Sequence, residues 1–359
     1  MKRIALMTPS LTSGGAERVV SIWSSELSKL SDQIFLIITY RTEQEYETYA
    51  DVKKIYLYES YAQSKQVSIF SKIKKMRSVF KENNIDIVIP FIAHTGMLAT
   101  AASMFLKTDV IETVRNNPGS RSKNICLRLP RKISIALSKR CIVQNEEQKA
   151  YFSERVQKKI AVFSNPLHPS VTRIEKEYKT TSPLVFMTAG RLEKQKNHKL
   201  LCDAFKLAVN QCPDIELKIY GAGSMQREME QYIDSIGMQG KIALCGRTNN
   251  IAETLSKADA FILSSNHEGM PNALLEAMAA GLPCISTDCP TGPSEMIVNE
   301  KSGLLVPVGD AESMAAAIVK IASDYKAAIE MGKNAREFAV EQYEASNSAK
   351  RLLRFIEEI

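Results

Sequence analysis

The sequence predicts an α/β protein built from two parallel-sheet domains, and three observations lead to this prediction. A chain of 359 residues, 45% of them hydrophobic and 24% charged, is long enough for two hydrophobic cores. Short apolar runs alternate with helical stretches in both halves, which is typical of parallel strands connected by covering helices. The polar motifs come directly after apolar runs, where open α/β sheets bind their ligands.

Eight apolar runs are the predicted strands. They form two series, residues 4–7, 34–39, 85–90 and 141–143, then 184–188, 216–220, 260–264 and 283–286. Between the series, the chain is rich in proline and charge and has little apolar periodicity. We therefore expect an N-terminal domain (1–168), a linker (169–182), a C-terminal domain (183–340) and a helix (341–359) that packs back on the first domain. The strand ends of both domains should face a shared cleft.

The net charge of +7 is unevenly distributed. Residues 1–180 carry 29 Lys and Arg against 17 Asp and Glu, so +12, and residues 181–359 carry 18 against 23, so −5. Two basic windows, 60–81 and 113–145, contain no acidic residue. Such clusters favour anionic partners. Because no nucleic-acid-binding signature is present, an anionic membrane surface or a polyphosphate is expected rather than nucleic acid.

Cysteine usage and hydropathy predict the compartment. No apolar run reaches the roughly 18 residues that a membrane span needs. The seven cysteines are scattered, and none forms the closely spaced pair of a zinc or redox site. We expect a cytoplasmic protein, peripheral at the inner face of the cell membrane.

Two glutamates, Glu268 and Glu276, follow the predicted strand 260–264. They enclose Gly269, Met270, Pro271, Asn272 and Ala273. Pro271 and Gly281 frame a helix predicted over 271–280. Because a helix N-terminus favours anions, we expect a diphosphate at the backbone of 270–273, sugar hydroxyls at Glu268 and ribose hydroxyls at Glu276. The alternative is that both glutamates are solvated charges on a helix surface.

Two cations, Arg191 and Lys196, follow the predicted strand 184–188. Departure of a nucleotide builds negative charge on its β-phosphate, and both cations are expected to stabilise it. Lys194 could take the place of Lys196, and a surface ion pair with Glu193 is the alternative for either lysine. The chain has no Asp-x-Asp triplet to hold a divalent metal, so we expect no metal cofactor.

Glycine-containing turns follow other predicted strands. Gly221 and the sequence Gly246-Arg247-Thr248 allow close approach of a base or ribose, although each could be an ordinary turn. Near the N-terminus, Gly14 and Gly15 open a helix after the first strand, in a loop suited to phosphate or acceptor. This loop lacks the third glycine of a dinucleotide fingerprint and the Lys-Ser/Thr of a P-loop, which disfavours dehydrogenases and kinases.

Together these motifs resemble the family 4 retaining glycosyltransferases, which have the GT-B fold. The matching segments are Gly14-Gly15-Ala16-Glu17-Arg18, Gly190-Arg191-Leu192, Glu268-x7-Glu276 and Pro293-Ser294-Glu295. The resemblance implies that Glu268 contacts the donor sugar, Glu276 the ribose, Arg191 and Lys196 the diphosphate, and Gly15 lies in the phosphate-facing loop. Residues 246–248 would frame the base. It also implies front-face transfer, in which the departing phosphate takes the acceptor's proton and no carboxylate nucleophile is required.

Two polar residues of the N-terminal half are further candidates for binding acceptor or sugar. Arg115, with Glu112 nearby, is similar to the Glu-Arg-Asn or Glu-His-Ser segments of bacterial enzymes that extend lipid-linked surface glycans. It would face the donor sugar or an acceptor phosphate, unless it is an exposed turn residue. His94 follows the predicted strand 85–90 and either faces the cleft or caps and packs.

Each of the two basic windows has two structural interpretations. In the first, an apolar stripe with helical spacing lies among lysines: Val67, Phe70, Ile73, Met76 and Phe80. This helix either lies on an anionic bilayer or packs as an ordinary core helix. The second, residues 121–140, contains Arg128, Arg131 and Lys132 and either grips the diphosphate of a polyprenyl-linked acceptor or packs on its own domain.

The expected activity is transfer of a hexose or N-acetylhexosamine from a UDP-sugar to a polyprenyl-diphosphate-linked oligosaccharide. Such a reaction would serve capsule, lipopolysaccharide or related polysaccharide synthesis in bacteria. The alternatives are a nucleotide-sugar epimerase of the same fold, a glycosyltransferase with a soluble acceptor, and a non-catalytic partner subunit. A partner subunit would have no need for Glu268, Arg191 and Lys196 together.

Overall fold

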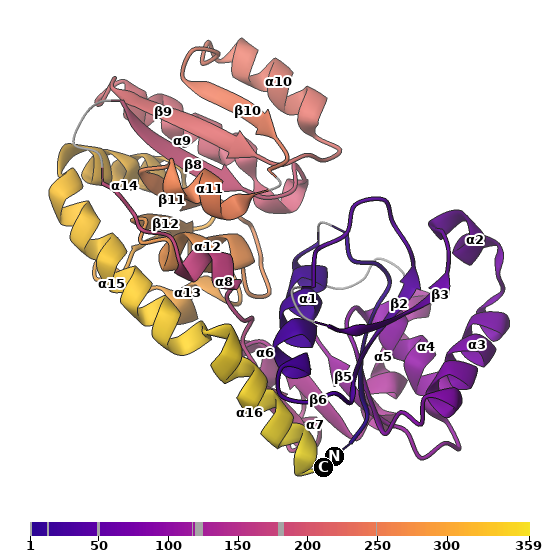
Figure 1. Ribbon diagram of the computed structural model, residues 1–359. Helices are drawn as coiled ribbons and strands as arrows, with labels where there is room; N and C mark the ends of the chain where they lie inside the picture. Colours follow the sequence, from indigo (N-terminus) through magenta and orange to yellow (C-terminus); the bar gives the residue numbers. More distant parts are fainter. Residues whose placement is uncertain are drawn as a thin grey trace. The chain divides into compact units, whose positions relative to one another are not determined.

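The chain folds into two compact units, each a parallel sheet covered by helices (Figure 1). The computed structural model describes residues 2–12, 14–48, 51–116, 118, 125–178, 183–248 and 250–359, with the backbone alone over 125–128. The first unit comprises Met1–Pro166 and Ala345–Ile359, and the second comprises Leu167–Glu344. This architecture confirms the predicted α/β class with two parallel-sheet domains.

The first unit is built on a seven-stranded parallel sheet of order β3-β2-β1-β4-β5-β6-β7. Its strands are β1 (Ile4–Thr8), β2 (Ile34–Tyr40), β3 (Lys53–Tyr58), β4 (Ile87–Pro90), β5 (Asp109–Thr113), β6 (Arg140–Val143) and β7 (Ile160–Val162). The central strand β1 pairs Ile4 with Ile34 on one side and with Ile87 on the other. Because helices cover both faces, the central strands are continuous apolar runs.

The helices of the first unit follow its strands. They are α1 (Gly15–Ser28), α2 (Tyr61–Gln66), α3 (Ile69–Glu82), α4 (Ala93–Ser103), α5 (Ile125–Leu137), α6 (Glu146–Ala150), α7 (Glu154–Gln157) and α16 (Ala345–Glu357). Ser68 caps α3 by accepting a hydrogen bond from the Ser71 amide at 3.2 Å. None of the helices in the described ranges is both long and apolar enough to span a bilayer.

The basic helix of the first window packs as an ordinary core helix. Met76 and Phe80 are buried, at 0% and 1% exposure, against the sheet. Val67 precedes the helix instead of forming its first turn, because Ser68 caps the helix and Ile69 begins it. Only the start of the predicted stripe is accessible, where Phe70 is 87% exposed. The inner residues of the stripe therefore fill the core, as in the second of the two alternatives, whereas its N-terminal end faces solvent.

The second unit is built on a six-stranded parallel sheet of order β10-β9-β8-β11-β12-β13. Its strands are β8 (Leu184–Ala189), β9 (Ile215–Tyr220), β10 (Ile242–Gly246), β11 (Ala260–Leu263), β12 (Cys284–Thr287) and β13 (Leu304–Val306). The helices are α8 (Pro169–Thr172), α9 (His198–Val209), α10 (Gln226–Ser235), α11 (Ile251–Ser256), α12 (Asn272–Ala279), α13 (Pro293–Met296), α14 (Ala311–Ser323) and α15 (Tyr325–Tyr343). The predicted linker therefore starts with α8, and its residues 179–182 lie outside the described part of the chain.

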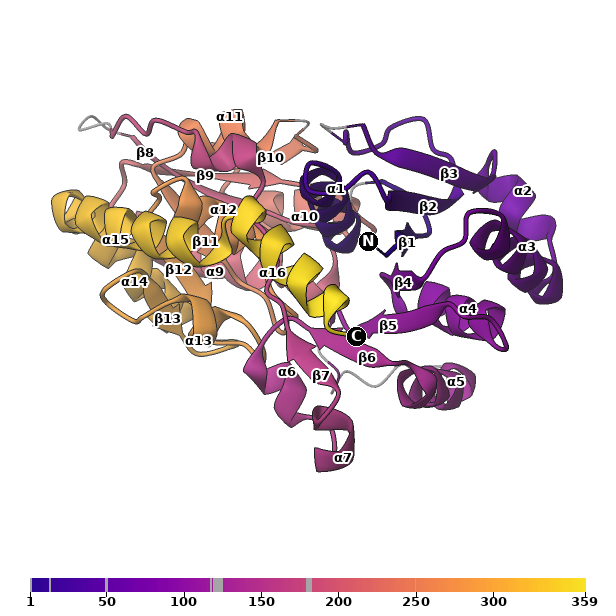
Figure 2. The same ribbon diagram turned by 60° about the horizontal axis from the view of Figure 1, so that its bottom comes forward.

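The C-terminal helical region is divided into α15 and α16 at Glu344, whose backbone is extended in ψ (132°). The helix α16 belongs to the first unit, where it lies beside α1 (Figures 1 and 2). Its residues Leu352 and Ile356 are fully buried in the same cluster as Trp23. The Trp23 indole also donates a hydrogen bond to Ser348 at 2.9 Å. The last helix is thus part of the core of the unit that begins the chain.

Each sheet has a point where its strand order reverses. In the first sheet β1 lies between β2 and β4, and in the second β8 lies between β9 and β11. At such a point the connections leave in opposite directions, so the loops after the two neighbouring strands separate and leave room for a ligand. The loops after β8 and β11 carry the two strongest sequence motifs, Arg191 to Lys196 and Glu268 to Glu276.

Candidate active site

The segment from β11 to α12 carries both motif glutamates. The helix α12 spans Asn272–Ala279, close to the predicted range, and Pro271 occupies its N-cap position just ahead of the first turn. Glu268 and Glu276 are buried, at 7% and 3% exposure. The alternative in which both are solvated surface charges is therefore wrong. A buried carboxylate has to be paired or hydrogen-bonded, and the surroundings of Glu268 supply this.

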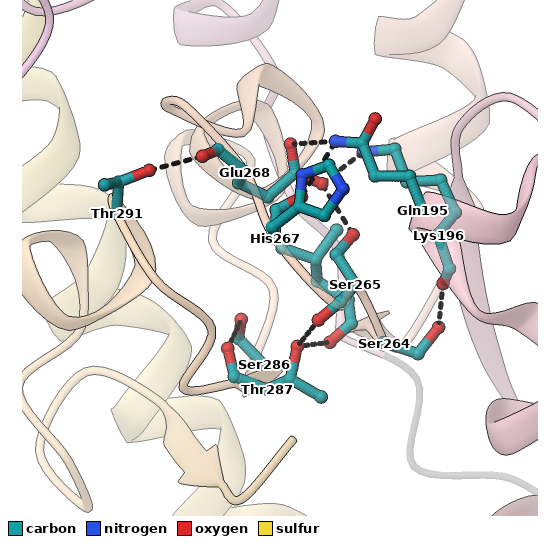
Figure 3. Close-up of polar contacts among 10 residues, drawn as sticks. Gln195, Lys196, Ser264, Ser265, His267, Glu268, Ser286, Thr287 and Thr291 are labelled. Atoms are coloured by element: carbon teal, nitrogen blue, oxygen red, sulfur yellow. Dashed lines mark hydrogen bonds and ion pairs between the residues drawn. The ribbon is translucent and has the colours of Figure 1, made fainter. Parts of the chain in front are cut away.

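The Glu268 carboxylate has three polar partners (Figure 3). The Lys196 ammonium lies 2.6 Å from its Oε1, and the Ser265 hydroxyl donates to the same oxygen at 2.5 Å. The Gln195 amide approaches Oε2 at 3.5 Å. The Lys196 side chain is 16% exposed, so the pair is largely shielded from water. Both charges are thereby oriented before any ligand binds.

The loops after β8 and β11 are joined by backbone contacts. Ser264 donates to the Lys196 carbonyl at 2.8 Å, and the Asn266 amide donates to the Gln195 carbonyl at 2.8 Å. The Asn266 side chain donates to the Lys194 carbonyl at 3.0 Å. Asn197, which tolerates its left-handed φ of 47° better than most residues, donates to Asn266 at 3.0 Å. These contacts hold Lys196 and Glu268 at a fixed separation.

The loop before α13 supports Glu268 from the other side. The Thr291 hydroxyl donates to the Glu268 carbonyl (Figure 3). Gly292 has a φ of +105°, which L side chains rarely adopt, and an added Cβ would lie 2.9 Å from the Pro271 ring and 3.0 Å from the Gly269 carbonyl. Only glycine fits there. This explains why the Pro293-Ser294-Glu295 motif is preceded by glycine.

The strand ends β8, β9 and β10 meet through their glycines. The Gly190 amide donates to the Tyr220 carbonyl at 2.9 Å, and the Gly221 amide donates to the Gly246 carbonyl at 2.7 Å. An added Cβ on Gly221 would lie 1.8 Å from the Gly190 carbonyl oxygen, so a side chain cannot be accommodated. A ligand at this edge would therefore meet backbone instead of side chains.

The other predicted cations of the second unit point to solvent. Arg191 and Arg247 are exposed, and neither guanidinium has a hydrogen bond or ion pair with another described residue. Thr248, by contrast, bonds Thr254 at 2.7 Å between their hydroxyls. Lys196, and not the exposed Lys194, is the lysine that pairs with Glu268. The structure therefore distinguishes the two lysines that the sequence left open.

The charged pair affects two buried neighbours. Burial lowers the pKa of His198 to about 4, and the Lys196 ammonium contributes in the same direction. Burial raises the pKa of the Cys289 thiol to about 12, with the Glu268 carboxylate adding to the shift. At neutral pH both neighbours are therefore uncharged. Lys196 and Glu268 are left as the charges of this network.

Arg115 of the first unit is held between two aromatic rings. Its Cζ lies 4.7 Å from the ring centroids of both Trp23 and Phe91, and its Nη1 donates to Asn165 at 3.1 Å. Its Nε and Nη2 are buried and have no hydrogen-bond partner among the residues that the structure describes. Burial lowers the pKa of Arg115, although a guanidinium stays protonated at neutral pH. The alternative of an exposed turn residue is therefore wrong for Arg115.

The remaining predicted residues of the first unit are not gathered into one site. Gly14 precedes α1 and Gly15 begins it, while Ser13 lies outside the described residues. Lys132 is exposed, and Arg131 acts electrostatically on the buried Glu112. The side chain of Arg128 is not among those described. Between His94, Arg115, Arg131 and Lys132 the described structure shows no hydrogen bond or ion pair.

Sequence reasoning missed the residues that position Glu268. Gln195, Ser265 and Thr291 all contact it, from three different loops. Two of these loops could have drawn attention, because Ser264-Ser265 directly follows β11 and Thr291 precedes a glycine and proline. Over the residues described, no cluster of three or more His, Cys, Asp or Glu side chains could hold a metal ion.

Comparison with known proteins adds to this geometry. Residues 171–338 match the family model described as glycosyl transferases group 1, and this range lies inside the second unit. A Campylobacter jejuni protein is 27% identical over 100% of this chain and 99% of its own length. It is named GalNAc-alpha-(1->4)-GalNAc-alpha-(1->3)-diNAcBac-PP-undecaprenol alpha-1,4-N-acetyl-D-galactosaminyltransferase.

A second relative and a solved structure extend the comparison. UDP-Gal:alpha-D-GlcNAc-diphosphoundecaprenol alpha-1,3-galactosyltransferase of Escherichia coli is 28% identical over 76% of both chains. The structure of Anabaena HepE in complex with UDP and glucose superposes over 100% of both chains, with a TM-score of 0.80 at 15% identity. This likeness confirms the GT-B fold. The fold, the family match in the second unit and the relatives together support the assignment of this chain as a GT-B glycosyltransferase.

Proposed function

We propose that the chain is a family 4, retaining, metal-independent glycosyltransferase. It would transfer a hexose or N-acetylhexosamine from a UDP-sugar to a lipid-diphosphate-linked oligosaccharide in bacterial surface glycan synthesis. The observation that carries this proposal is the Lys196–Glu268 pair, held at 2.6 Å where the strand order of the second sheet reverses. Sheets of this kind bind nucleotides at that point.

The proposed chemistry assigns separate tasks to the charged residues. When UDP departs, negative charge builds on its β-phosphate, and the Lys196 ammonium is already positioned to stabilise it. Arg191 is exposed on the same loop, and its guanidinium has no partner in the described structure, so it is available to bind the diphosphate bidentately. Glu268 holds Lys196 and offers its carboxylate to sugar hydroxyls. In front-face transfer the proton of the acceptor hydroxyl goes to the departing phosphate.

The remaining parts of the donor site are proposed along the same sheet edge. The backbone at the glycines of β8, β9 and β10 would receive the base and ribose, with Arg247 and Thr248 at its side. Glu276 would accept hydrogen bonds from the ribose hydroxyls, and residues 269–273 would approach the diphosphate at the start of α12.

The proposed acceptor class rests on relatives and on charge. The Campylobacter jejuni and Escherichia coli relatives both carry an undecaprenol diphosphate in their names. The basic N-terminal half, at +12, suits a ligand with a diphosphate. Arg115 adds a preorganised guanidinium at the end of β5, with its Nε and Nη2 edge unpaired and suited to a phosphate or a sugar hydroxyl.

Contact with an anionic membrane is proposed through α5. Leu129, Ile133 and Leu137, spaced at one turn, are 65%, 48% and 61% exposed, so this helix turns an apolar stripe outward. Lys132 is exposed on the same helix, and a cation beside an apolar stripe suits the surface of an anionic bilayer. The second basic window, and not the first, therefore supplies the larger part of the membrane-binding face.

The activity is tested with purified protein, a panel of UDP-hexoses and UDP-N-acetylhexosamines, and short polyprenyl-diphosphate glycans, with and without EDTA. Products are identified by mass spectrometry, and the anomeric configuration by NMR. We expect a product that keeps the donor's configuration at a rate that EDTA leaves unchanged. An inverted product or a metal requirement would contradict the mechanism, and conversion of the UDP-sugar into its epimer without transfer would support the epimerase instead.

The membrane face is tested by vesicle flotation. The triple variant Leu129→Ser, Ile133→Ser and Leu137→Ser should lose binding to vesicles of phosphatidylglycerol and phosphatidylcholine. The matched control is Leu207→Ser, Val298→Ser and Val308→Ser, which removes the same number of exposed apolar side chains from the second unit. Equal binding by both triple variants would contradict a docking role for α5.

A further inference from the structure

A cavity of about 320 Å³ lies in the first unit at the carboxyl ends of β1 and β2. This volume is at the lower end of the range for small-molecule sites, roughly 300–1,000 Å³. Its wall is formed by the strand ends and by α2, α3 and α4, which lie together beside β2 and β3 in Figure 1. The side chains that define its chemistry are Tyr40, Tyr61, Lys65, Lys72 and His94.

The charge of this cavity is positive and uncompensated. Lys65 and Lys72 both line it, and no carboxylate does. Neither lysine's ammonium group has a hydrogen-bond or ion-pair partner in the described parts of the chain. Burial lowers the pKa of His94, and the Lys72 ammonium adds to this effect, so the imidazole is neutral at pH 7. Two ammonium groups beside one cavity repel each other, and an anion with two or more charges relieves that repulsion.

The remaining wall suits a sugar. Tyr40 and Tyr61 stand edge to face, with ring centroids 5.2 Å apart, and Tyr61 is 59% exposed. The Tyr40 amide is tied to the Pro9 carbonyl at 3.0 Å, which fixes this ring at the end of the strand. Rigid aromatic faces pack against the C–H faces of pyranose rings, while a neutral His94 can both donate to and accept from sugar hydroxyls.

Apolar side chains stand next to the charged wall. Ile69 lies three residues, about one helical turn, before Lys72 and is 60% exposed, and Phe70 next to it is 87% exposed, although neither residue lines the cavity. A nucleotide has no hydrocarbon chain that would contact these apolar side chains. A diphosphate attached to an isoprenoid carries such a chain. The combination of two unpaired ammonium groups, an aromatic pair and adjacent exposed apolar residues therefore fits a lipid-linked diphosphosugar better than it fits a nucleotide or a free phosphate.

We propose that this cavity binds the diphosphate and the first sugar of the acceptor. Lys65 and Lys72 contact the diphosphate, Tyr40, Tyr61 and His94 contact the sugar, and Ile69 and Phe70 meet the first isoprene units. This inference rests on the proposed function, because it assigns a place to the acceptor class proposed above. It assigns the acceptor's charged group to α2 and α3, the two helices that lie in the first basic window of the sequence.

The test measures binding of farnesyl-diphospho-N-acetylglucosamine by isothermal titration calorimetry, so that no acceptor glycan has to be known. Loss of one ammonium–phosphate contact should weaken binding about tenfold, and the double variant Lys65→Gln/Lys72→Gln should lose about 100-fold. Lys65→Arg/Lys72→Arg keeps both charges and should retain most of the affinity. The matched control is Lys81→Gln, an exposed lysine in the last turn of α3.

Three further ligands identify what the lysines recognise. Octyl N-acetylglucosaminide, which lacks phosphate, should bind wild type weakly and should not be affected by the double variant. UDP should bind all variants equally, which also shows that they are folded. Phosphatidylglycerol vesicles should bind wild type and the double variant equally. Unchanged affinity of the double variant for the farnesyl probe would overturn the proposal, and so would a parallel loss of vesicle binding, which would indicate a lipid headgroup site.

The outcome can be separated from that of the proposed function. If wild type transfers sugar to lipid-diphosphate acceptors and the double variant does so with an unchanged acceptor KM, the cavity proposal fails alone. If wild type binds the farnesyl probe through the two lysines but glycosylates no lipid-diphosphate acceptor, the proposed function fails and the binding site stands.

Discussion

The two units of this protein differ in whether the cations at their candidate sites are paired with a carboxylate. In the second unit, the partly buried Lys196 and the buried Glu268 pair at 2.6 Å. In the first unit, Arg115 has a buried Nε and Nη2 without partners, and Lys65 and Lys72 line a cavity that contains no carboxylate. The sequence shows the same contrast, with a charge of +12 in its first 180 residues and −5 in the remainder.

Paired and unpaired cations are two different ways in which a protein can prepare a site for an anion. A paired cation is oriented in advance, although the cost of taking both charges out of water offsets much of their mutual attraction. An unpaired buried cation costs stability in the free protein unless a ligand supplies the missing charge. Under the proposed function, the Lys196–Glu268 pair of the second unit would orient the donor, and the acceptor would neutralise the cations of the first unit.

The largest effect is expected where the paired site is broken. Lys196→Ala should lower kcat/KM for sugar transfer by about 10²–10³-fold, which is typical for loss of one group that stabilises transition-state charge. Lys194→Ala is the matched control, because this exposed lysine of the same loop pairs with no carboxylate. Its kinetics should stay close to wild type. Equal losses in steady-state assays of the two variants would remove the diphosphate assignment of Lys196.

A second comparison concerns the pH dependence of stability. Burial lowers the pKa of His198 in the second unit to about 4 and raises the pKa of Glu112 in the first to about 7. Below about pH 6.5 the unfolded chain binds a proton that folded His198 excludes, so stability falls as the pH drops towards 4. Folded Glu112 keeps a proton that the unfolded chain releases above about pH 4.5, so its contribution is lost as the pH rises through 7. Each effect amounts to about 3 kcal/mol.

The opposite slopes can be measured separately, because Trp23 is the single tryptophan and reports on the first unit. Urea unfolding between pH 4.5 and 8 is followed by tryptophan fluorescence for the first unit and by far-UV circular dichroism for the whole chain. Glu112→Gln should flatten the fluorescence-detected profile, and His198→Gln should reduce the acid sensitivity of the other transition. The same slope for both units in wild type would contradict this assignment.

The fold was predictable because its strands are apolar runs that helices bury on both faces. Every strand predicted from the sequence is present, whereas β3, β5, β7, β10 and β13 were not among the predicted strands. Three of these omissions have specific reasons. β3 (Lys53–Tyr58) lies at the sheet edge and starts with two exposed lysines, so its pattern does not read as a buried strand. β7 and β13 are each three residues long, too short for a periodicity to emerge.

The candidate site was predictable only in part. Lys196 and Glu268 stand in motifs at strand ends, and the sequence alone identified both. Gln195 contacts a carboxylate 73 positions away, so its role depends on the meeting of two loops that no local pattern records. Amphipathicity likewise could not separate the two basic helices, since Met76 of α3 is buried whereas Leu129 of α5 is 65% exposed. Which face packs on the sheet is decided by tertiary contacts.

A third prediction compares Arg115, which has two nitrogens without hydrogen-bond partners among the described residues, with an arginine whose guanidinium bonds two carbonyls. In the second unit, Arg336 donates to the carbonyls of Ala279 and Thr172. Arg336→Met should lower the free energy of unfolding by about 2 kcal/mol, because two carbonyls lose a charged donor. Arg115→Met removes a buried charge with two unpaired nitrogens, so its stability should stay within about 1 kcal/mol of wild type, while transfer activity falls at least about tenfold.

Urea unfolding and steady-state kinetics on the same preparations decide this comparison. Arg115→Lys keeps the charge but not the planar edge of the guanidinium, and its activity should fall between wild type and Arg115→Met. A large loss of stability in Arg115→Met with normal activity would show that Arg115 serves the packing of Trp23 and Phe91 instead of a ligand.

The smallest expected effect is a change in the pKa of His94 in the cavity when the neighbouring Lys72 is replaced. Burial is the main cause of the lowered pKa of His94, and the Lys72 ammonium is the second. Lys72→Gln should therefore raise this pKa towards its ordinary value without restoring it, whereas Lys81→Gln should leave it unchanged. The titration is followed by the imidazole proton or nitrogen resonances in NMR spectra.

The same titration also tests where the diphosphate binds. If it binds between Lys65 and Lys72, saturating farnesyl-diphospho-N-acetylglucosamine should raise the pKa of His94 in wild type, because its negative charge favours the imidazolium. A pKa that does not respond to the probe would place the diphosphate away from these two lysines.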